Sequence, residues 1–196
     1  MQVDFDFTGR HVVVFGGTTG INFGIAHAFA RQGARRTVAS RKPENVEAAV
    51  AELRGHGGEV HGVCADVRDF DAVGRALQES VDRFGPIDVL VSGAAGNFLC
   101  GGKDMSSNGF KVVVDIDLVG SFHVLRQAHA HLRKPGASVI SITAPQSFVP
   151  MRYQAHACAA KAGVDQLTRV LALEWGGEGV RINSISPGPI DGTEGF

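Results

Sequence analysis

The sequence predicts an α/β fold in which helices cover both faces of a doubly wound parallel sheet. Short β-branched apolar runs alternate with longer segments of helical periodicity, which is typical of parallel strands joined by helical crossovers. The chain has 196 residues, 44% of them hydrophobic, which suits one domain with one sizeable core. No Ser/Gly-rich linker, charge block or shift in composition divides it. We therefore expect residues 1–196 to form a single domain.

This alternation predicts the individual strands and helices. The predicted strands are the short apolar runs 11–15, 37–39, 60–64, 88–91, 138–142 and 181–185. The predicted helices are the longer segments 21–32, 43–55, 70–84, 110–133 and 153–175, each stopping near a glycine, a proline or a polar turn. Ligands of such sheets bind beyond the carboxyl ends of the strands. The residues that follow each strand are therefore the first candidates for function.

Composition favours a small-molecule partner. The 19 Lys and Arg residues nearly balance 20 Asp and Glu, and no basic block of the kind that binds nucleic acid is present. Cys64, Cys100 and Cys158 are too scattered for a disulfide framework or a zinc site, which favours a reducing compartment and no metal centre. Residues 1–10 lack an apolar core, and glycines and polar residues break the uncharged run 11–30. We therefore expect a cytoplasmic protein with no secretory signal and no membrane span.

A glycine-rich turn follows the first predicted strand. Glycine there allows a tight turn and close backbone approach, so that N–H groups at the start of the next helix can hold a pyrophosphate. The candidate phosphate-binding residues are Gly16, Thr18, Thr19, Gly20 and Ile21. Their Gly-x-x-x-Gly spacing resembles the short-chain dehydrogenase/reductase superfamily, although Asn22 stands where that superfamily has its third glycine. A Rossmann-like sheet that binds a dinucleotide is expected, and a glycine turn without a ligand is the alternative.

The end of the second predicted strand indicates which dinucleotide is bound. An NAD-dependent protein would place Asp or Glu there for the ribose 2′-hydroxyl, whereas this chain has Ser40 and Arg41. A hydroxyl and a guanidinium can bind a 2′-phosphate, which a carboxylate would repel. NADP(H) is therefore the expected cofactor, and a solvated arginine at the start of a loop is the alternative.

The superfamily resemblance implies further cofactor contacts. Asp66 matches the residue that meets the adenine ring, and the segment 187–190 matches the loop on the nicotinamide side. The additional residues expected to bind the cofactor are Asp66, Val67, Ala94, Ala95, Gly96, Lys161, Pro187, Gly188 and Ile190.

The catalytic positions of the superfamily are only partly kept. Its members use a Tyr four residues before a Lys on one helix, a Ser at the end of the fifth strand, and an Asn in the preceding helix. Here Lys161 matches the Lys, but Ala157 replaces the Tyr, Ala144 replaces the Ser and Asp117 replaces the Asn. Ordinary interconversion of alcohols and ketones is therefore not expected.

The segments around these replaced positions resemble one particular branch of the superfamily. Ala-Ala-Gly-Asn-Phe-Leu-Cys at 94–100, Asp-Ile-Asp at 115–117, His-Ala at 156–157 and Pro-Gly-Pro-Ile-Asp-Gly-Thr-Glu-Gly at 187–195 look like the peroxisomal-type 2,4-dienoyl-CoA reductases. That branch also lacks the Tyr and carries an Asp for the Asn. The resemblance extends over about 10–195 and implies NADPH-dependent reduction of a conjugated dienoyl thioester in fatty acid metabolism.

The same resemblance implies roles for particular residues. Asp117 and Lys161 would act as a pair on a proton-carrying water, and Phe98 would line the acyl site. A homotetramer through 110–133 and 153–175 is implied. So is a longer complete protein, in which a helical lid and a seventh strand absent from this chain follow the sixth strand.

This chemistry needs no tyrosine. Hydride added to the far end of a conjugated diene gives a dienolate, whose charge lies on the thioester oxygen and whose carbon is then protonated. A carboxylate and an ammonium that flank a water can deliver that proton. The alternatives are that Asp117 binds only backbone or solvent and that Lys161 is an exposed helix lysine.

Three other residues are candidate substrate contacts. Gln146 and Ser147, in the loop after the fifth predicted strand, can hydrogen-bond a thioester or serve only as loop residues. His156 is rotated about 100° from Ala157 on its helix, so it either touches substrate or packs inside.

Two hypotheses about function remain at this stage. The first is an NADPH-dependent reductase of an enoyl or dienoyl thioester. The alternative is a catalytically decayed homologue that binds NADP(H) as a structural or sensing ligand. An Asp117 kept beside Lys161 would favour the enzyme, because a decayed site has no need for that pair.

Overall fold

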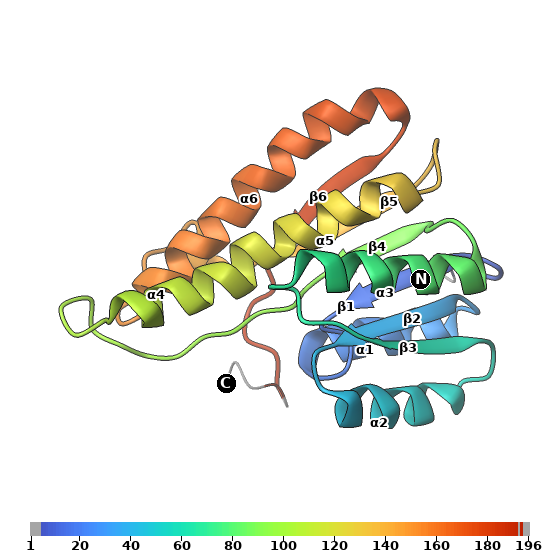
Figure 1. Cartoon of the computed structure of the whole chain (residues 1–196), viewed down its shortest axis with the longest axis horizontal. Coiled ribbons are helices and arrows are strands. Elements are labelled where there is room, and N and C mark those ends of the chain that lie inside the picture. Colours follow the sequence, from blue (N-terminus) through green and yellow to red (C-terminus); the bar gives the residue numbers. More distant parts are fainter. Residues whose placement is uncertain (1–4, 192, 194–196) are drawn as a thin grey trace.

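A single parallel sheet organises the computed structural model, which describes residues 5–191 and 193 (Figure 1). Its six strands lie in the order β3-β2-β1-β4-β5-β6, and every neighbouring pair is parallel. The strands are β1 (His11–Phe15), β2 (Arg35–Ser40), β3 (Val60–Cys64), β4 (Val89–Ser92), β5 (Ser138–Ile142) and β6 (Arg181–Ile185). This order reverses direction between β1 and β4, as in doubly wound folds that bind a ligand at that point. The predicted fold class is confirmed.

Helices cover both faces of the sheet. They are α1 (Gly20–Arg31), α2 (Pro43–Arg54), α3 (Phe70–Phe84), α4 (Ser107–Val114), α5 (Gly120–Ala128) and α6 (Ala155–Trp175). In β1, Val13 and Phe15 join the core shared with α3, α5 and α6, whereas Val12 and Val14 join the core shared with α1 and α2. Because both faces are buried, β1 is apolar at every position from Val12 to Phe15 instead of alternating.

Two of the predicted helices have different limits. The expectation of one helix over 110–133 is wrong: α4 begins earlier, because the Ser106 hydroxyl accepts a hydrogen bond from Gly109 N, and a π-helical turn, Asp115–Val119, separates α4 from α5. A short 3-10 turn, His129–His131, follows α5. The helix expected over 153–175 begins at Ala155, because Tyr153 has φ 65°, outside the helical region. The other predicted elements are confirmed, with small shifts at some ends.

The structure explains Arg36, a charged residue in the middle of a buried strand. Its guanidinium is fully buried and donates to the carbonyl oxygens of Ala34 (2.8 Å), Leu53 (3.2 Å) and Gly57 (3.0 Å). The last carbonyls of a helix have no intrahelical partner and carry partial negative charge. Arg36 therefore holds the end of α2 against β2. Burial lowers the pKa of this guanidinium from its very high ordinary value.

Asp88 is expected to make stability depend on pH. Its buried carboxylate accepts hydrogen bonds from Arg133 Nε (2.6 Å), Arg10 Nη1 (3.0 Å) and His11 N (2.9 Å). Burial alone would raise the pKa of Asp88, but these three donors outweigh it and hold the pKa below its ordinary value. A carboxyl whose pKa is lower in the folded state stabilises that state above its unfolded pKa, and this contribution is lost as pH falls through the folded pKa.

Asp88→Asn is accordingly expected to lower the free energy of unfolding by about 1–2 kcal/mol at neutral pH, where charged hydrogen bonds become neutral ones. Urea unfolding between pH 7 and pH 3 checks this, with Glu47→Gln, at an exposed helix position, as the control. The difference between parent and Asp88→Asn should narrow once pH falls below about 5, near the ordinary range of carboxyl pKa values. A difference that stays constant down to the acid limit would contradict this role of Asp88.

Candidate active site

The turn between β1 and α1 provides a site for an anion. Gly16 has φ 73°, and a Cβ atom there would lie 2.9 Å from Ala94 N, so only glycine fits against the segment after β4. The side chain of the N-cap residue, Thr19, makes no capping hydrogen bond, and the first turn of α1 contains no acidic residue. The free N–H groups and the positive end of the helix dipole are therefore available to a phosphate.

A hollow of about 340 Å³ lies beside this turn, at the carboxyl ends of β1 to β4. The structure brings many of the predicted cofactor-binding residues together in its lining: Gly16, Thr18, Thr19, Ser40, Arg41, Asp66, Val67, Ala94, Ala95 and Gly96. Lys42 and Asn45, which the sequence analysis did not single out, also line it. Arg41 and Lys42 make the rim of this hollow basic near Ser40, as a 2′-phosphate requires.

Asp66 is the carboxylate of this first hollow, and Arg68 fixes it. Arg68 Nε donates to both carboxylate oxygens of Asp66, at 3.0 and 3.1 Å. The hydrogen bonds from Arg68 lower the pKa of Asp66. Arg41, which contributes to the same shift, stays on the rim where an anionic ligand would reach it.

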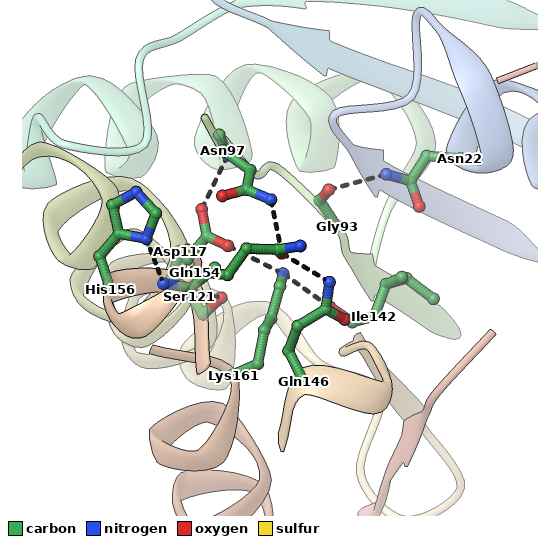
Figure 2. A network of polar contacts seen from close by, with 12 residues as sticks. Asn22, Gly93, Asn97, Asp117, Ser121, Ile142, Gln146, Gln154, His156 and Lys161 are labelled. Carbon is green, nitrogen blue, oxygen red and sulfur yellow. Dashed lines mark hydrogen bonds and ion pairs between the residues drawn. The ribbon is translucent and has the colours of Figure 1, made fainter. Parts of the chain in front are cut away.

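Asn22 is a functional position that the sequence analysis did not assign. Its side-chain Nδ2 donates to the carbonyl oxygen of Gly93, at 2.8 Å, and ties α1 to the end of β4 (Figure 2). A Cβ atom on Gly93 would lie 2.3 Å from Asn22 Oδ1, so any side chain at position 93 would collide with the Asn22 amide. The side chain that replaces the third glycine of the superfamily therefore acts as a clamp. A glycine directly after the fourth strand was the signal that could have indicated it.

A second hollow, of about 580 Å³, adjoins the first. The two share Asn22, Gly93, Ala95 and Gly96 in their linings. Predicted site residues that line the second hollow are Gly20, Ile21, Ala95, Gly96, Asp117, Gln146, Lys161, Pro187, Gly188 and Ile190. Ala144 and Ala157, which stand where the superfamily has hydroxyl groups, line it as well.

Asp117 and Lys161 form a buried ion pair at this second hollow. Lys161 Nζ lies 3.1 Å from Asp117 Oδ2, with 10% and 2% of the two side chains exposed. The other carboxylate oxygen accepts the backbone N–H of Gly96 at 2.8 Å, and Nζ also donates to Ile142 O at 3.4 Å. The predicted juxtaposition is confirmed, so the alternatives of a solvated Asp117 and an exposed Lys161 are excluded.

The π-helical turn places this carboxylate. Asp117 lies in the middle of Asp115–Val119, where the carbonyl of Asp117 accepts a hydrogen bond from Ser121 Oγ, at 2.6 Å. Such widened turns occur mostly as single turns inside α-helices and often at functional sites. The turn aims Asp117 at the segment after β4.

Three predicted substrate contacts lie outside the linings of both hollows: Phe98, Ser147 and His156. The ring of His156 is fully buried, accepts the N–H of Ala157 at 2.8 Å, and packs edge-on against Phe98 with centroids 4.5 Å apart. His156 thus supports Phe98 from behind. Of the motif at 187–195, Gly192, Glu194 and Gly195 lie outside the described residues.

Residues 5–191 and 193 show neither a membrane-spanning helix nor a cluster of metal ligands. No helix there is long and apolar enough to cross a membrane. Over the same residues, no group of three or more His, Cys, Asp and Glu side chains could hold a metal ion.

The sheet order, the glycine turn at the start of α1 and the hollow beyond the strands define a Rossmann-like dinucleotide-binding protein. The chain belongs to the short chain dehydrogenase family, whose model matches residues 10–196.

Named relatives narrow the comparison. The chain is 44% identical to the peroxisomal 2,4-dienoyl-CoA reductase of Rattus norvegicus, over 93% of this chain and 63% of that protein. It is 40% identical to the protein of the same name from Arabidopsis thaliana, over 96% and 66%. A probable 2,4-dienoyl-CoA reductase from Bacillus subtilis is 36% identical, over 95% and 74%. The chain spans 63% to 66% of the first two relatives.

Solved structures agree with the fold. A short chain dehydrogenase from Bacillus anthracis superimposes with a TM-score of 0.88 at 34% identity, covering 93% of this chain and 77% of that one. A citronellol catabolism dehydrogenase from Pseudomonas aeruginosa gives 0.89 at 33% identity, covering 96% and 78%.

Proposed function

We propose that this protein is an NADPH-dependent oxidoreductase that reduces a 2,4-dienoyl-CoA or a related enoyl thioester. The observation that carries the proposal is the buried Asp117–Lys161 pair in a hollow where Ala144 and Ala157 leave no hydroxyl group. A site that had merely lost its chemistry would not need a buried charge matched by a new carboxylate. The names of the relatives agree with this substrate class.

The residues of the first hollow suit NADPH. The uncapped start of α1 would hold the pyrophosphate, and Ser40 with Arg41 would hold the 2′-phosphate. Lys161, which lines the second hollow, would hold the ribose on the nicotinamide side. Bound NADPH supplies a hydride to the substrate.

The second hollow would manage the proton. When C5 of the dienoyl group gains a hydride, its electrons move along the conjugated system to the thioester oxygen. A water held beside the Asp117–Lys161 pair then gives a proton to C2, and the hydroxide formed is reprotonated through Lys161 Nζ from solvent. The remaining double bond lies between C3 and C4, in agreement with the (3E)-enoyl-CoA products in the relatives' names.

The direct test is turnover of a 2,4-dienoyl-CoA with NADPH by the purified chain, followed by loss of NADPH absorbance and identification of the product. A parallel binding measurement distinguishes the alternative hypothesis. A chain that binds NADPH tightly but reduces no dienoyl-CoA would be the catalytically decayed homologue.

The proposed assembly is a homotetramer. Apolar side chains on α5 and α6 are exposed in the single chain, among them Phe122 (44%) and Leu173 (86%). Exposed apolar groups of this kind mark surfaces between proteins. Light scattering on the purified chain is expected to give the mass of four copies, and a monomer would contradict this.

The location of the protein in the cell stays a prediction. The sequence favours the cytoplasm, whereas several relatives are named as peroxisomal.

A further inference from the structure

The second hollow must stabilise negative charge on the thioester oxygen, and two positions that could do so carry methyl groups. Ala144 and Ala157 offer no donor. Lys161 Nζ is already shared between Asp117 and the carbonyl of Ile142. Catalysis of this kind gains most from a fixed donor that faces the oxygen where charge develops. Another donor in the lining is therefore required.

Three side-chain amides in the same lining, those of Asn97, Gln154 and Gln146, are joined by hydrogen bonds, and a backbone N–H determines which end of the Asn97 amide is the oxygen. The N–H of Phe98 donates to Asn97 Oδ1, at 2.9 Å. A backbone N–H can only donate, so the oxygen of Asn97 is identified and its Nδ2 faces Gln154. That Nδ2 donates to Gln154 Oε1, at 2.9 Å, and Gln146 Nε2 donates to the same oxygen, at 2.9 Å. The Gln154 amide therefore cannot be flipped without losing both bonds.

The other end of the Gln154 amide is free to bind. Asn97, Gln146 and Gln154 all line the second hollow with Asp117 and Lys161, and Figure 2 shows their amides gathered beside that pair. Within residues 5–191 and 193, the Nε2 group of Gln154 has no hydrogen-bond partner, although it carries two N–H donors.

The backbone before Gln154 is held in an unusual conformation. Tyr153 has φ 65° without being glycine, and its carbonyl accepts the N–H of Cys100, at 2.9 Å. Such strain persists only where the surrounding structure enforces it, and it concentrates at functional sites. The conformation of Tyr153 ends the loop before α6 and leaves Gln154, the N-cap residue of α6, in the lining of the second hollow.

We propose that Gln154 Nε2 donates a hydrogen bond to the thioester carbonyl oxygen of the substrate, while Asn97 and Gln146 act as positioning residues. This inference rests on the proposed dienoyl-CoA reduction. Bound NADPH would supply a hydride to C5, and the electron pair displaced onto the thioester oxygen would be stabilised there by Gln154 Nε2–H. Protonation of C2 by a water held beside the Asp117–Lys161 pair then returns the electron pair to carbon and restores the carbonyl.

The test compares variants that keep the shape of the side chain. Gln154→Met is expected to lower kcat for dienoyl-CoA by about 10²- to 10³-fold, the usual effect of losing one oxyanion donor. The NADPH dissociation constant should stay unchanged, and the variant should stay folded, with only a small fall in melting temperature from the two hydrogen bonds that Oε1 no longer accepts. Gln78→Met, on the exposed surface of α3, is the matched control and should keep the parental kcat.

Gln154→Glu supplies an independent pH readout. A carboxylate there accepts from Asn97 and Gln146 but cannot donate, whereas its protonated form has an O–H donor. The kcat of Gln154→Glu, relative to the parent, should therefore rise as pH falls, while that of Gln154→Met should not.

Three results would overturn the proposal. The first is a Gln154→Met variant that turns over near the parental rate. The second is a loss of activity that comes together with lost NADPH binding or lost folding, since that would assign Gln154 a structural role. The third is a parent protein that turns over no dienoyl-CoA. That result would contradict the proposed function itself, and it is distinguished from the first two because the parent, and not only the variant, is inactive.

Discussion

Replacing Asp117 with alanine is expected to lower kcat by about 10²- to 10⁴-fold, the usual contribution of general acid–base catalysis, and to leave NADPH affinity nearly unchanged. The physical reason is that Asp117, 1% exposed, pairs with Lys161 and lines the second hollow but not the first. Its loss removes the partner that holds a water and leaves the Lys161 charge buried without a counter-ion. Steady-state kinetics with dienoyl-CoA, together with calorimetric titration of NADPH, measure the two effects.

Lys161→Ala is expected to damage both kcat and NADPH affinity, because the same ammonium would hold the ribose. The losses in kcat from Asp117→Ala and Lys161→Ala should not add in the double variant, since each residue positions or charges the other. Lys111→Ala serves as the control, because Lys111 is exposed on α4 and its ion pair with Asp115 lies outside the linings of both hollows. An Asp117→Ala enzyme at the parental rate would show that this carboxylate is structural.

The second large effect concerns the choice of cofactor. We expect NADPH to bind more tightly than NADH by about 1.5–3 kcal/mol, the range for hydrogen bonds to a charged group, and Arg41→Ala to remove most of that preference. Arg41 and Ser40 line the first hollow, whereas the carboxylate in the same lining, Asp66, is held by Arg68. The 2′-phosphate would therefore meet the Arg41 guanidinium, while the carboxylate of Asp66 is engaged by Arg68.

Titration calorimetry with both cofactors on the parent and on Arg41→Ala measures this preference directly. Arg54→Ala, at the exposed end of α2, is the matched control for loss of a surface charge. Equal dissociation constants for NADPH and NADH in the parent would overturn the assignment of the cofactor.

Much of the fold could be predicted because local signals carried it. Each strand of a sheet buried on both faces is a short apolar run, and the connecting helices have their own period, so the six strands were found from the sequence. Asp117 and Lys161 could be paired in advance because both occupy positions of a known family motif. Their contact in the structure, at 3.1 Å, follows from that motif.

The features that escaped prediction depend on partners distant in the sequence. Asn22 bonds to Gly93, 71 residues away, and Asn97 bonds to Gln154, 57 residues away. Neither amide has a periodicity or a neighbour that would indicate its partner. The role of Arg36 could not be predicted for the same reason, since its guanidinium donates to carbonyl oxygens at and just beyond the end of α2.

The widened turn at Asp115–Val119 has a consequence for how this site can change during evolution. Val113, Asp117, Ser121 and Leu125 are all buried and follow one another at intervals of four. In a regular α-helix, each step of four residues turns about 40° past a full turn, so three steps would place Leu125 about 120° around the helix axis from Val113. The extra residue in the π-helical turn takes up part of this rotation. The direction of Asp117 is therefore encoded by the number of residues in the segment. Loss or gain of a single codon there would rotate the carboxylate by about 100° out of the hollow.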